Sequence, residues 1–290
     1  MNIPTKKLKN GFEIPVYGLG TWQMGGKNER DPQNDDKADI QAIRSAIEHG
    51  VTHIDTAEIY ADGYSEQLLG RAIKAYDRSK LFLVSKVQSA HLGYDQILEA
   101  CKKSLERIGT SYLDLYLLHR YNPEFSLKKS IEALDALVAQ GLVRNIGVCN
   151  FGTGNLEEAQ SYTKHKIVCD QVHYNLIFRE PERAELLVYC QKNDIFLSAW
   201  RPTQYAVLAS ETPSTMKELC EKYQKTPLQI AINWLISQDH VITLSKTGSV
   251  AHLEENLGAL GWQMDPEDIE RLRREYPNQQ AVSDRIPLGK

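Results

Sequence analysis

The chain has 290 residues, which exceeds the length of one small domain and suits a single α/β barrel of about 250 residues. Hydrophobic residues make up 42% of it and charged residues 25%, and no stretch approaches the ~20 consecutive apolar residues of a membrane span, so disorder, fibres and transmembrane bundles are excluded. The formal charge is -4, and no basic tract could neutralise a run of phosphates, so nucleic acid is not an expected partner.

The N-terminus and the cysteines bear on the cellular compartment. Residues 1–7 are polar and lack the apolar segment of a signal peptide, which predicts a cytoplasmic protein with no membrane partner. The five cysteines are an odd number and contain no C-x-x-C pair, which argues against a disulfide framework and against a thiolate zinc site. We therefore expect reduced cysteines and no metal ion.

The chain opens with a hairpin pattern and continues as an alternation of strands and helices. Residues 7–14 alternate around Asn10-Gly11, the strongest local hairpin signal. Short apolar runs that predict strands follow at 16–20, 51–55, 81–86, 113–119, 143–150, 167–172, 195–200 and 241–244. Segments with helical periodicity lie at 38–48, 66–75, 95–108, 127–140, 153–163, 181–192, 213–237 (a double stretch) and 250–260.

This alternation predicts a parallel sheet covered by helices, and eight such units close a (β/α)₈ TIM barrel. A doubly wound open sheet is the alternative, but no Gly-x-Gly-x-x-Gly motif follows the first strand, so an ordinary dinucleotide-binding loop is absent. No segment resembles a linker. We expect a single domain over 1–290, with the N-terminal hairpin plugging the base of the barrel and the residues after 262 forming a packed extension.

Four polar residues lie where successive predicted strands end, at the rim that forms the active site in such a barrel. They are Asp55, Tyr60, Lys86 and His119. Singly, each has a structural interpretation as a helix cap, a solvated rim charge or a satisfied neutral side chain. Together they suggest a site, because charges that end neighbouring buried strands are costly to desolvate unless they pair. A Lys–Asp pair beside a tyrosine would also stabilise the phenolate and bring the phenol proton within reach of donation near neutral pH.

Six blocks of sequence in this order resemble the aldo-keto reductase family: GLGTW at 18–22, IDTAEIY at 54–60, LDLYLLH at 113–119, IGVCNF at 146–151, QVHYN at 171–175 and ENL at 255–257. The resemblance implies the barrel fold, NADPH as the usual cofactor with NADH possible, and no metal. It places the family's catalytic residues on Asp55, Tyr60, Lys86 and His119. It implies hydride transfer to a carbonyl carbon, with Tyr60 as proton donor, Lys86 tuning the tyrosine while held by Asp55, and His119 orienting the carbonyl oxygen.

The resemblance also implies a cofactor site that departs from the family's pattern. Cys149 stands where a serine is common, and Trp200 where a tyrosine stacks on the nicotinamide. His252 replaces an arginine that commonly binds the 2′-phosphate, and Lys246 offers a cation for the same phosphate. The implied cofactor-binding residues are Gly20, Thr21, Trp22, Asp55, Cys149, Asn150, Gln171, Trp200, Arg201, Pro202, Thr203, Lys246, Thr247, His252, Glu255 and Asn256. The implied substrate contacts are Trp22, Tyr60, His119 and Trp200.

Two other functions fit these residues. A Schiff-base aldolase would use Lys86 as its nucleophile, although Asp55 should keep that lysine charged and a nucleophilic lysine must lose its proton. A non-catalytic nucleotide-binding regulator would share the cofactor site and lack turnover. We favour reduction of aldehydes or ketones to alcohols. Short loops after the strands and a short tail after Tyr276 suggest an open site for small aldehydes and α-dicarbonyls, and the sequence indicates no oligomeric state.

Overall fold

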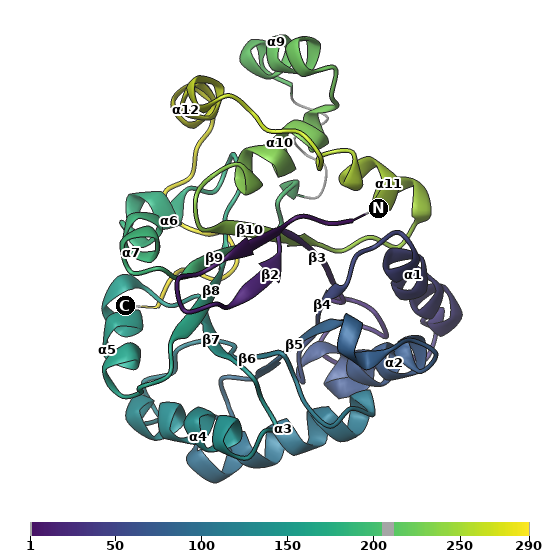
Figure 1. Ribbon diagram of the computed structural model, residues 1–290, viewed down its shortest axis with the longest axis vertical. Coiled ribbons are helices and arrows are strands. Elements are labelled where there is room, and N and C mark those ends of the chain that lie inside the picture. Colours follow the sequence, from purple (N-terminus) through teal and green to yellow (C-terminus); the bar gives the residue numbers. More distant parts are fainter. Residues whose placement is uncertain (1, 205–211, 290) are drawn as a thin grey trace.

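Eight parallel strands close into a barrel (Figure 1). The computed structural model describes residues 2–204 and 212–289. The strands follow one another around the barrel in chain order, and the last strand pairs with the first. They are β3 (Tyr17–Gly20), β4 (His53–Asp55), β5 (Phe82–Val87), β6 (Leu115–Leu118), β7 (Ile146–Cys149), β8 (Ile167–His173), β9 (Phe196–Trp200) and β10 (Val241–Ser245). The fold class predicted from the sequence is therefore confirmed.

Helices surround this barrel on the outside (Figure 1). They are α1 (Asp36–Glu48), α2 (Tyr64–Ile73), α3 (Tyr94–Ile108), α4 (Leu127–Ala139), α5 (Thr153–Ser161), α6 (Glu180–Arg183), α7 (Leu186–Lys192), α9 (Ser214–Tyr223), α10 (Pro227–Ile236), α11 (Val250–Leu257) and α12 (Pro266–Glu275). Two short 3₁₀ helices, η1 (Tyr60–Gly63) and η2 (Arg78–Lys80), complete the set for the described residues. The expected helix at 181–192 is two helices, because Glu185 takes a left-handed φ of 59° between them. The double stretch at 213–237 divides at Gln224, which has a φ of 52°.

The N-terminal hairpin closes one end of the barrel, as expected. Its strands β1 (Thr5–Lys7) and β2 (Glu13–Pro15) pair antiparallel. Leu8, Phe12 and Ile14 pack with barrel-interior side chains that include Phe196 and Ile242, near the starts of β9 and β10. The hairpin therefore covers the N-terminal ends of the strands and leaves their C-terminal ends for a site.

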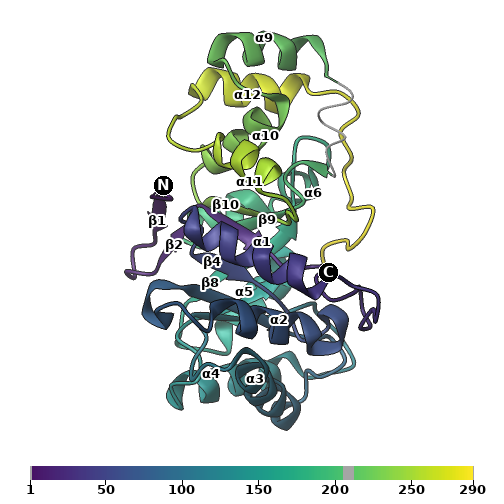
Figure 2. The ribbon, with the colours of Figure 1, turned by 90° about the vertical axis from the view of Figure 1, so that its right-hand side faces the viewer.

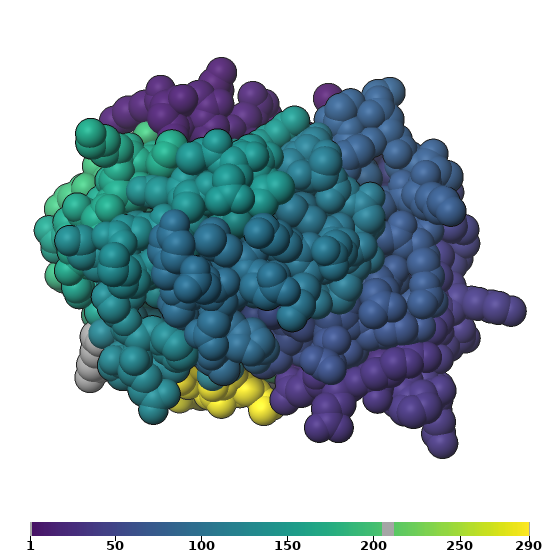
Figure 3. All heavy atoms as spheres, turned by 90° about the horizontal axis from the view of Figure 1, so that it is seen from below, coloured from purple at the N-terminus to yellow at the C-terminus, as the bar shows by residue number. Residues whose placement is uncertain are grey.

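The residues after 262 form the expected packed extension, and part of it is helical. Helix α12 buries Ile269 and Leu272, and the indole Nε1 of Trp234 donates to the carbonyl of Ile269 at 3.1 Å. The chain then runs down one side of the molecule to its end beside α5 (Figure 2). In Figure 3 the N-terminal hairpin (dark purple) and this tail (yellow) lie on opposite sides of the molecule.

Candidate active site

The barrel brings the four strand-end residues together. Asp55 ends β4, Lys86 lies in β5, His119 follows β6, and Tyr60 begins η1. The ammonium of Lys86 donates to Oδ1 of Asp55 at 2.5 Å, to the carbonyl of Thr56 at 2.8 Å and to the hydroxyl of Tyr60 at 3.3 Å. The rings of Tyr60 and His119 lie 5.7 Å apart in an edge-on arrangement.

Lys86 is charged although its side chain is fully buried. Burial alone would favour the neutral amine, but the attraction of the Asp55 carboxylate and of Tyr60 outweighs it and raises the pKa of Lys86 above its ordinary value. Asp55 is held from the other side as well, because Nε2 of Gln171 donates to its Oδ2 at 2.9 Å. A lysine held in this way is a poor Schiff-base nucleophile, since it does not lose its proton.

The phenol of Tyr60 differs from the sequence-based expectation. The sequence predicts that Lys86 lowers the pKa of this phenol toward neutral pH. Instead, burial raises the pKa of Tyr60 to about 12, and the nearby Lys86 ammonium offsets only part of that effect. The phenol is therefore protonated at neutral pH, which is the state that a proton donor requires.

His119 and Trp22 complete the surroundings of Tyr60. Burial and the positive charges of Lys86 and Arg120 hold the pKa of His119 well below its ordinary value, so the imidazole is neutral. A neutral imidazole offers one hydrogen-bond donor and one acceptor. The indole of Trp22 lies 5.0 Å from the ring of Tyr60, edge-on.

A strained turn sets the position of Tyr60. Ala61 and Asp62 both have left-handed backbones, with φ of 51° and 52°, which is uncommon for residues other than glycine. Their amides donate to the carbonyls of Lys27 at 2.7 Å and Asn28 at 2.8 Å, in the loop after β3. The sequence pattern does not predict this support, although the pair Gly25-Gly26 signals a tight loop there.

Four of the implied cofactor residues lie around the next three strand ends. Cys149 ends β7 as a buried thiol, and burial raises its pKa well above the ordinary value, so it stays a thiol. Asn150 follows with a left-handed φ of 57°, and its Nδ2 lies 3.4 Å from the carbonyl of His119. The indole Nε1 of Trp200 donates to Oδ1 of Asn150 at 3.3 Å. Nε2 of Gln171 donates to Asp55, so Gln171 borders the Asp55–Lys86 pair directly.

Trp200 is also engaged by the protein itself. Its ring stacks on the imidazole of His173 at 4.2 Å with an interplanar angle of 8°, and that imidazole stacks on Phe178 at 4.4 Å. His173 therefore covers one face of the indole. That the other face stacks on the nicotinamide stays a prediction. Arg201 follows with a φ of 58° and lies between Trp200 and Pro202, a buried residue.

The loop between β10 and α11 holds the implied phosphate-binding residues. Ser249 caps α11, and its hydroxyl accepts the amide of His252 at 3.2 Å. Lys246 and His252 are exposed, and Thr247 is buried, with its hydroxyl donating to the carbonyl of Ser249 at 3.0 Å. Glu255 and Asn256 lie further along α11.

The remaining implied residues lie at the walls of the barrel. Asn256 is buried and donates to the hydroxyl of Ser245 at 3.2 Å. Thr21 is fully buried and accepts the hydroxyl of Ser65 at 2.9 Å. A side chain at Gly20 would lie within 3.0 Å of Leu244, so the glycine permits the close approach of β3 and β10. Thr203 is half-buried after Pro202.

Residues 17–276 match the model of the aldo/keto reductase family. The chain belongs to the aldo-keto reductase family. It is therefore an NAD(P)H-dependent oxidoreductase. Within the part of the chain that the structure describes, no group of three or more His, Cys, Asp or Glu side chains could hold a metal ion, and no helix is long and apolar enough to cross a membrane.

Named relatives and solved structures agree with this family. The chain is 33% identical to methylglyoxal reductase YeaE of Escherichia coli (strain K12), over 93% of this chain and 94% of that protein. It is 32% identical to a glyoxal reductase of Bacillus subtilis (strain 168), over 92% and 91%. The solved thermostable aldo-keto reductase Tm1743 has a TM-score of 0.90 and 42% identity, covering 93% of this chain and 99% of that one. An aldo-keto reductase from Klebsiella pneumoniae in complex with NADPH has a TM-score of 0.84 and 33% identity, with 100% of both chains covered.

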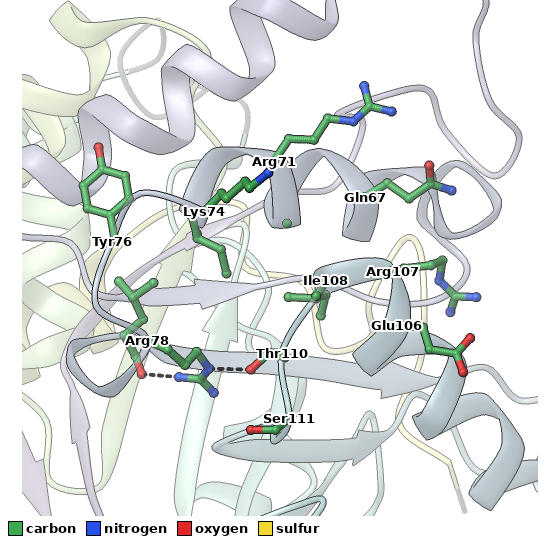
Figure 4. Close-up of a pocket in the computed structure, with 14 residues that line it drawn as sticks. Gln67, Arg71, Lys74, Tyr76, Arg78, Glu106, Arg107, Ile108, Thr110 and Ser111 are labelled. Carbon is green, nitrogen blue, oxygen red and sulfur yellow. Dashed lines mark hydrogen bonds between the residues drawn. The ribbon is translucent and has the colours of Figure 1, made fainter.

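A cavity of about 860 Å³ in this aldo-keto reductase lies away from the C-terminal strand ends, between α2 and α3 (Figure 4). Arg71, Lys74, Arg78 and Arg107 are among its lining residues. Both helices end here, and cations are favoured at helix C-termini, which accounts for Arg71, Lys74 and Arg107. Arg78 and Arg107 are also paired, with Asp114 at 2.7 Å and with Glu66 at 2.6 Å. We assign this cavity no part in the reaction.

Proposed function

We propose that this aldo-keto reductase uses NADPH to reduce small aldehydes and α-dicarbonyls to alcohols, with Tyr60 as the proton donor. The observation that carries the proposal is the protonated phenol of Tyr60, 3.3 Å from the charged Lys86 and beside the neutral imidazole of His119. The substrate class is supported by two relatives named for the reduction of methylglyoxal and glyoxal.

The side chains present fit the cofactor. Asn150 and Gln171 supply amide groups beside the Asp55–Lys86 pair, as a nicotinamide carboxamide requires. Lys246 and the N-terminus of α11 supply a cation and free amides, which suit a phosphate. NADPH, when bound, supplies the hydride that reaches the carbonyl carbon.

The protein's own residues carry out the proton transfer. Tyr60 donates the proton of its hydroxyl to the developing alkoxide oxygen, and the Lys86 ammonium stabilises the phenolate that remains. Asp55 keeps Lys86 charged and in place. His119 offers a ring N–H to the carbonyl oxygen and so orients the substrate.

We also propose that residues 1–290 act as one domain in the cytoplasm. The hairpin and the C-terminal tail both pack on the barrel, which supports one folding unit. All five cysteines are free thiols, which suits a reducing compartment.

The variant Tyr60→Phe tests the proton donor, because it keeps the ring and removes only the acid. We expect the reduction of methylglyoxal by NADPH, followed by the absorbance of the reduced cofactor, to fall by a factor on the order of 10² to 10⁴, with cofactor binding retained. Tyr64→Phe is the matched control, since the Tyr64 hydroxyl donates to Asp36 on α1 and should leave turnover unchanged. A Tyr60→Phe enzyme with the native rate would show that the acid is another group.

A further inference from the structure

The C-terminal tail, residues 277–289, is fixed to the connection after β8. The carboxylate of Glu180, a buried residue, accepts the amide of Ser283 at 2.8 Å and the amide of Leu288 at 3.1 Å. The amide of Arg179 donates to the carbonyl of Gln280 at 2.9 Å. These bonds hold the tail in one place over the C-terminal ends of the strands.

The hydroxyl of Ser283 makes three hydrogen bonds that favour one tautomer of His173. Its oxygen accepts the amides of Arg285 at 3.2 Å and Ile286 at 3.1 Å, so its proton is available for Nδ1 of His173 at 2.8 Å. The ring proton of His173 then lies on Nε2, which donates to Oε1 of Gln204 at 3.0 Å. Both ring nitrogens are therefore satisfied by a neutral imidazole. Burial supports the same state, because it lowers the pKa of His173 to about 4.

This imidazole lies parallel to the indole of Trp200. His173 lies in the middle of an aromatic stack between Phe178 and Trp200, and the plane of Trp200 is within 8° of its own. The same indole donates to Asn150, whose carbonyl accepts the amide of the tail residue Gly289 at 2.8 Å. The tail thus reaches Trp200 and Asn150, two implied cofactor contacts, by separate routes.

We propose that Ser283 is a positioning residue for NADP(H), and that through His173 it fixes the indole plane of Trp200 in the cofactor-binding wall. The inference rests on the proposed function and goes beyond it, since it makes the tail a determinant of cofactor affinity. Ser283 acts on binding and not on proton transfer, because its described contacts lead to Trp200 and not to Tyr60.

Cofactor affinity in tail variants tests this role. Calorimetry should show that Ser283→Ala weakens NADPH binding by roughly threefold to thirtyfold, which is of the order of the coupling free energies between linked sites. KM for NADPH should rise by a similar factor, while kcat at saturating NADPH stays within about twofold of the native value. Ser283→Thr, which keeps the hydroxyl, should restore the affinity. Val282→Ala is the matched control, since Val282 is 54% exposed in the same tail.

The outcomes separate this inference from the proposed function. Native NADPH affinity in a folded Ser283→Ala enzyme would overturn the role of Ser283 and leave the reductase proposal intact. A native enzyme that binds no NADPH would contradict the proposed function itself.

A double-mutant cycle tests the route through His173. His173→Phe keeps an aromatic ring in the stack and removes both ring nitrogens, so Ser283 loses its partner there. In that background Ser283→Ala should change NADPH affinity by less than about 1.5-fold, because coupled residues are not additive. An equal loss in both backgrounds would overturn the route.

The native enzyme offers a test that does not depend on variants folding. If the tail favours NADP⁺ binding, NADP⁺ must stabilise the tail by the same factor. Amide hydrogen exchange at Arg285 and Ile286, which donate to Ser283, should therefore slow at least about threefold when NADP⁺ is added. Unchanged exchange at both amides would contradict the proposal.

Discussion

Lys86 carries its charge without access to water, and that charge depends on two neighbours. Asp55 lies 2.5 Å and the Tyr60 hydroxyl 3.3 Å from its ammonium. In Lys86→Met the phenolate left after proton transfer has no counter-charge, so we expect carbonyl reduction to fall by a factor on the order of 10² to 10⁴. The same change leaves Asp55 as a buried charge without a cation, and we expect the free energy of unfolding to fall by about 3 to 5 kcal/mol.

Turnover of methylglyoxal and urea denaturation measure these two effects. Lys74→Met is the matched control, because Lys74 is exposed at the end of α2. Borohydride added with an aldehyde distinguishes a Schiff-base aldolase from a reductase. Because a charged lysine forms no Schiff base, we expect no adduct. A stable mass increase at Lys86 would contradict the reductase mechanism.

The sequence predicted where the site residues lie better than it predicted their surroundings. Asp55, Tyr60, Lys86 and His119 each end or follow a strand, and parallel strand ends meet at one rim, so their convergence was readable. The ionisation of Tyr60 was not, because burial outweighs Lys86 there and burial depends on tertiary packing. The stack of His173 on Trp200 could not be predicted for the same reason.

Among the elements, the β10–α11 loop should set the cofactor preference. Its exposed Lys246 and His252 lie next to the N-terminus of α11, where an anion such as the 2′-phosphate is favoured. We therefore expect NADPH to be preferred over NADH.

The ratio of kcat/KM for the two cofactors measures this preference. His252→Arg should widen the ratio, because arginine adds a permanent positive charge beside the phosphate. Lys246→Met should narrow it, while Lys217→Met, an exposed lysine on α9, should not change it. Equal kcat/KM for both cofactors would mean that the loop does not recognise the phosphate.

Elements with a regular pattern were predicted well, and irregular ones were not. The near-continuous apolar runs identified all eight barrel strands. The break between α6 and α7 was missed because Glu185 adopts a left-handed backbone without the glycine that usually signals one. The tail was expected only to pack, because Ser283 meets His173 across 110 positions of sequence and no local pattern reports such a contact.

The barrel buries His53 and His173 and partly buries His119, and this makes its stability sensitive to acid. Burial lowers the pKa of His53 and of His173 to about 4, and the pKa of His119 well below its ordinary value. In the unfolded chain each imidazole titrates near ~6.5. Between these values the unfolded state binds more protons than the folded state, so stability is complete above about pH 6.5 and falls as the pH drops toward 4.

One carboxyl group opposes this loss. Asp170 is fully buried, and burial raises its pKa well above the ordinary value, so the folded state holds a proton there that the unfolded chain releases above about pH 4. Below about pH 6.5 each unfolded imidazole is at least half protonated, so three histidines outweigh one carboxyl, and we expect the free energy of unfolding from urea titrations to decrease steadily from about pH 6.5 to about pH 4.5. His53→Gln should lower stability at pH 7 and flatten this slope, Asp170→Asn should steepen it, and His165→Gln, at an exposed position, should do neither. A native slope that is flat or of opposite sign would mean that the buried imidazoles accept protons inside the folded barrel.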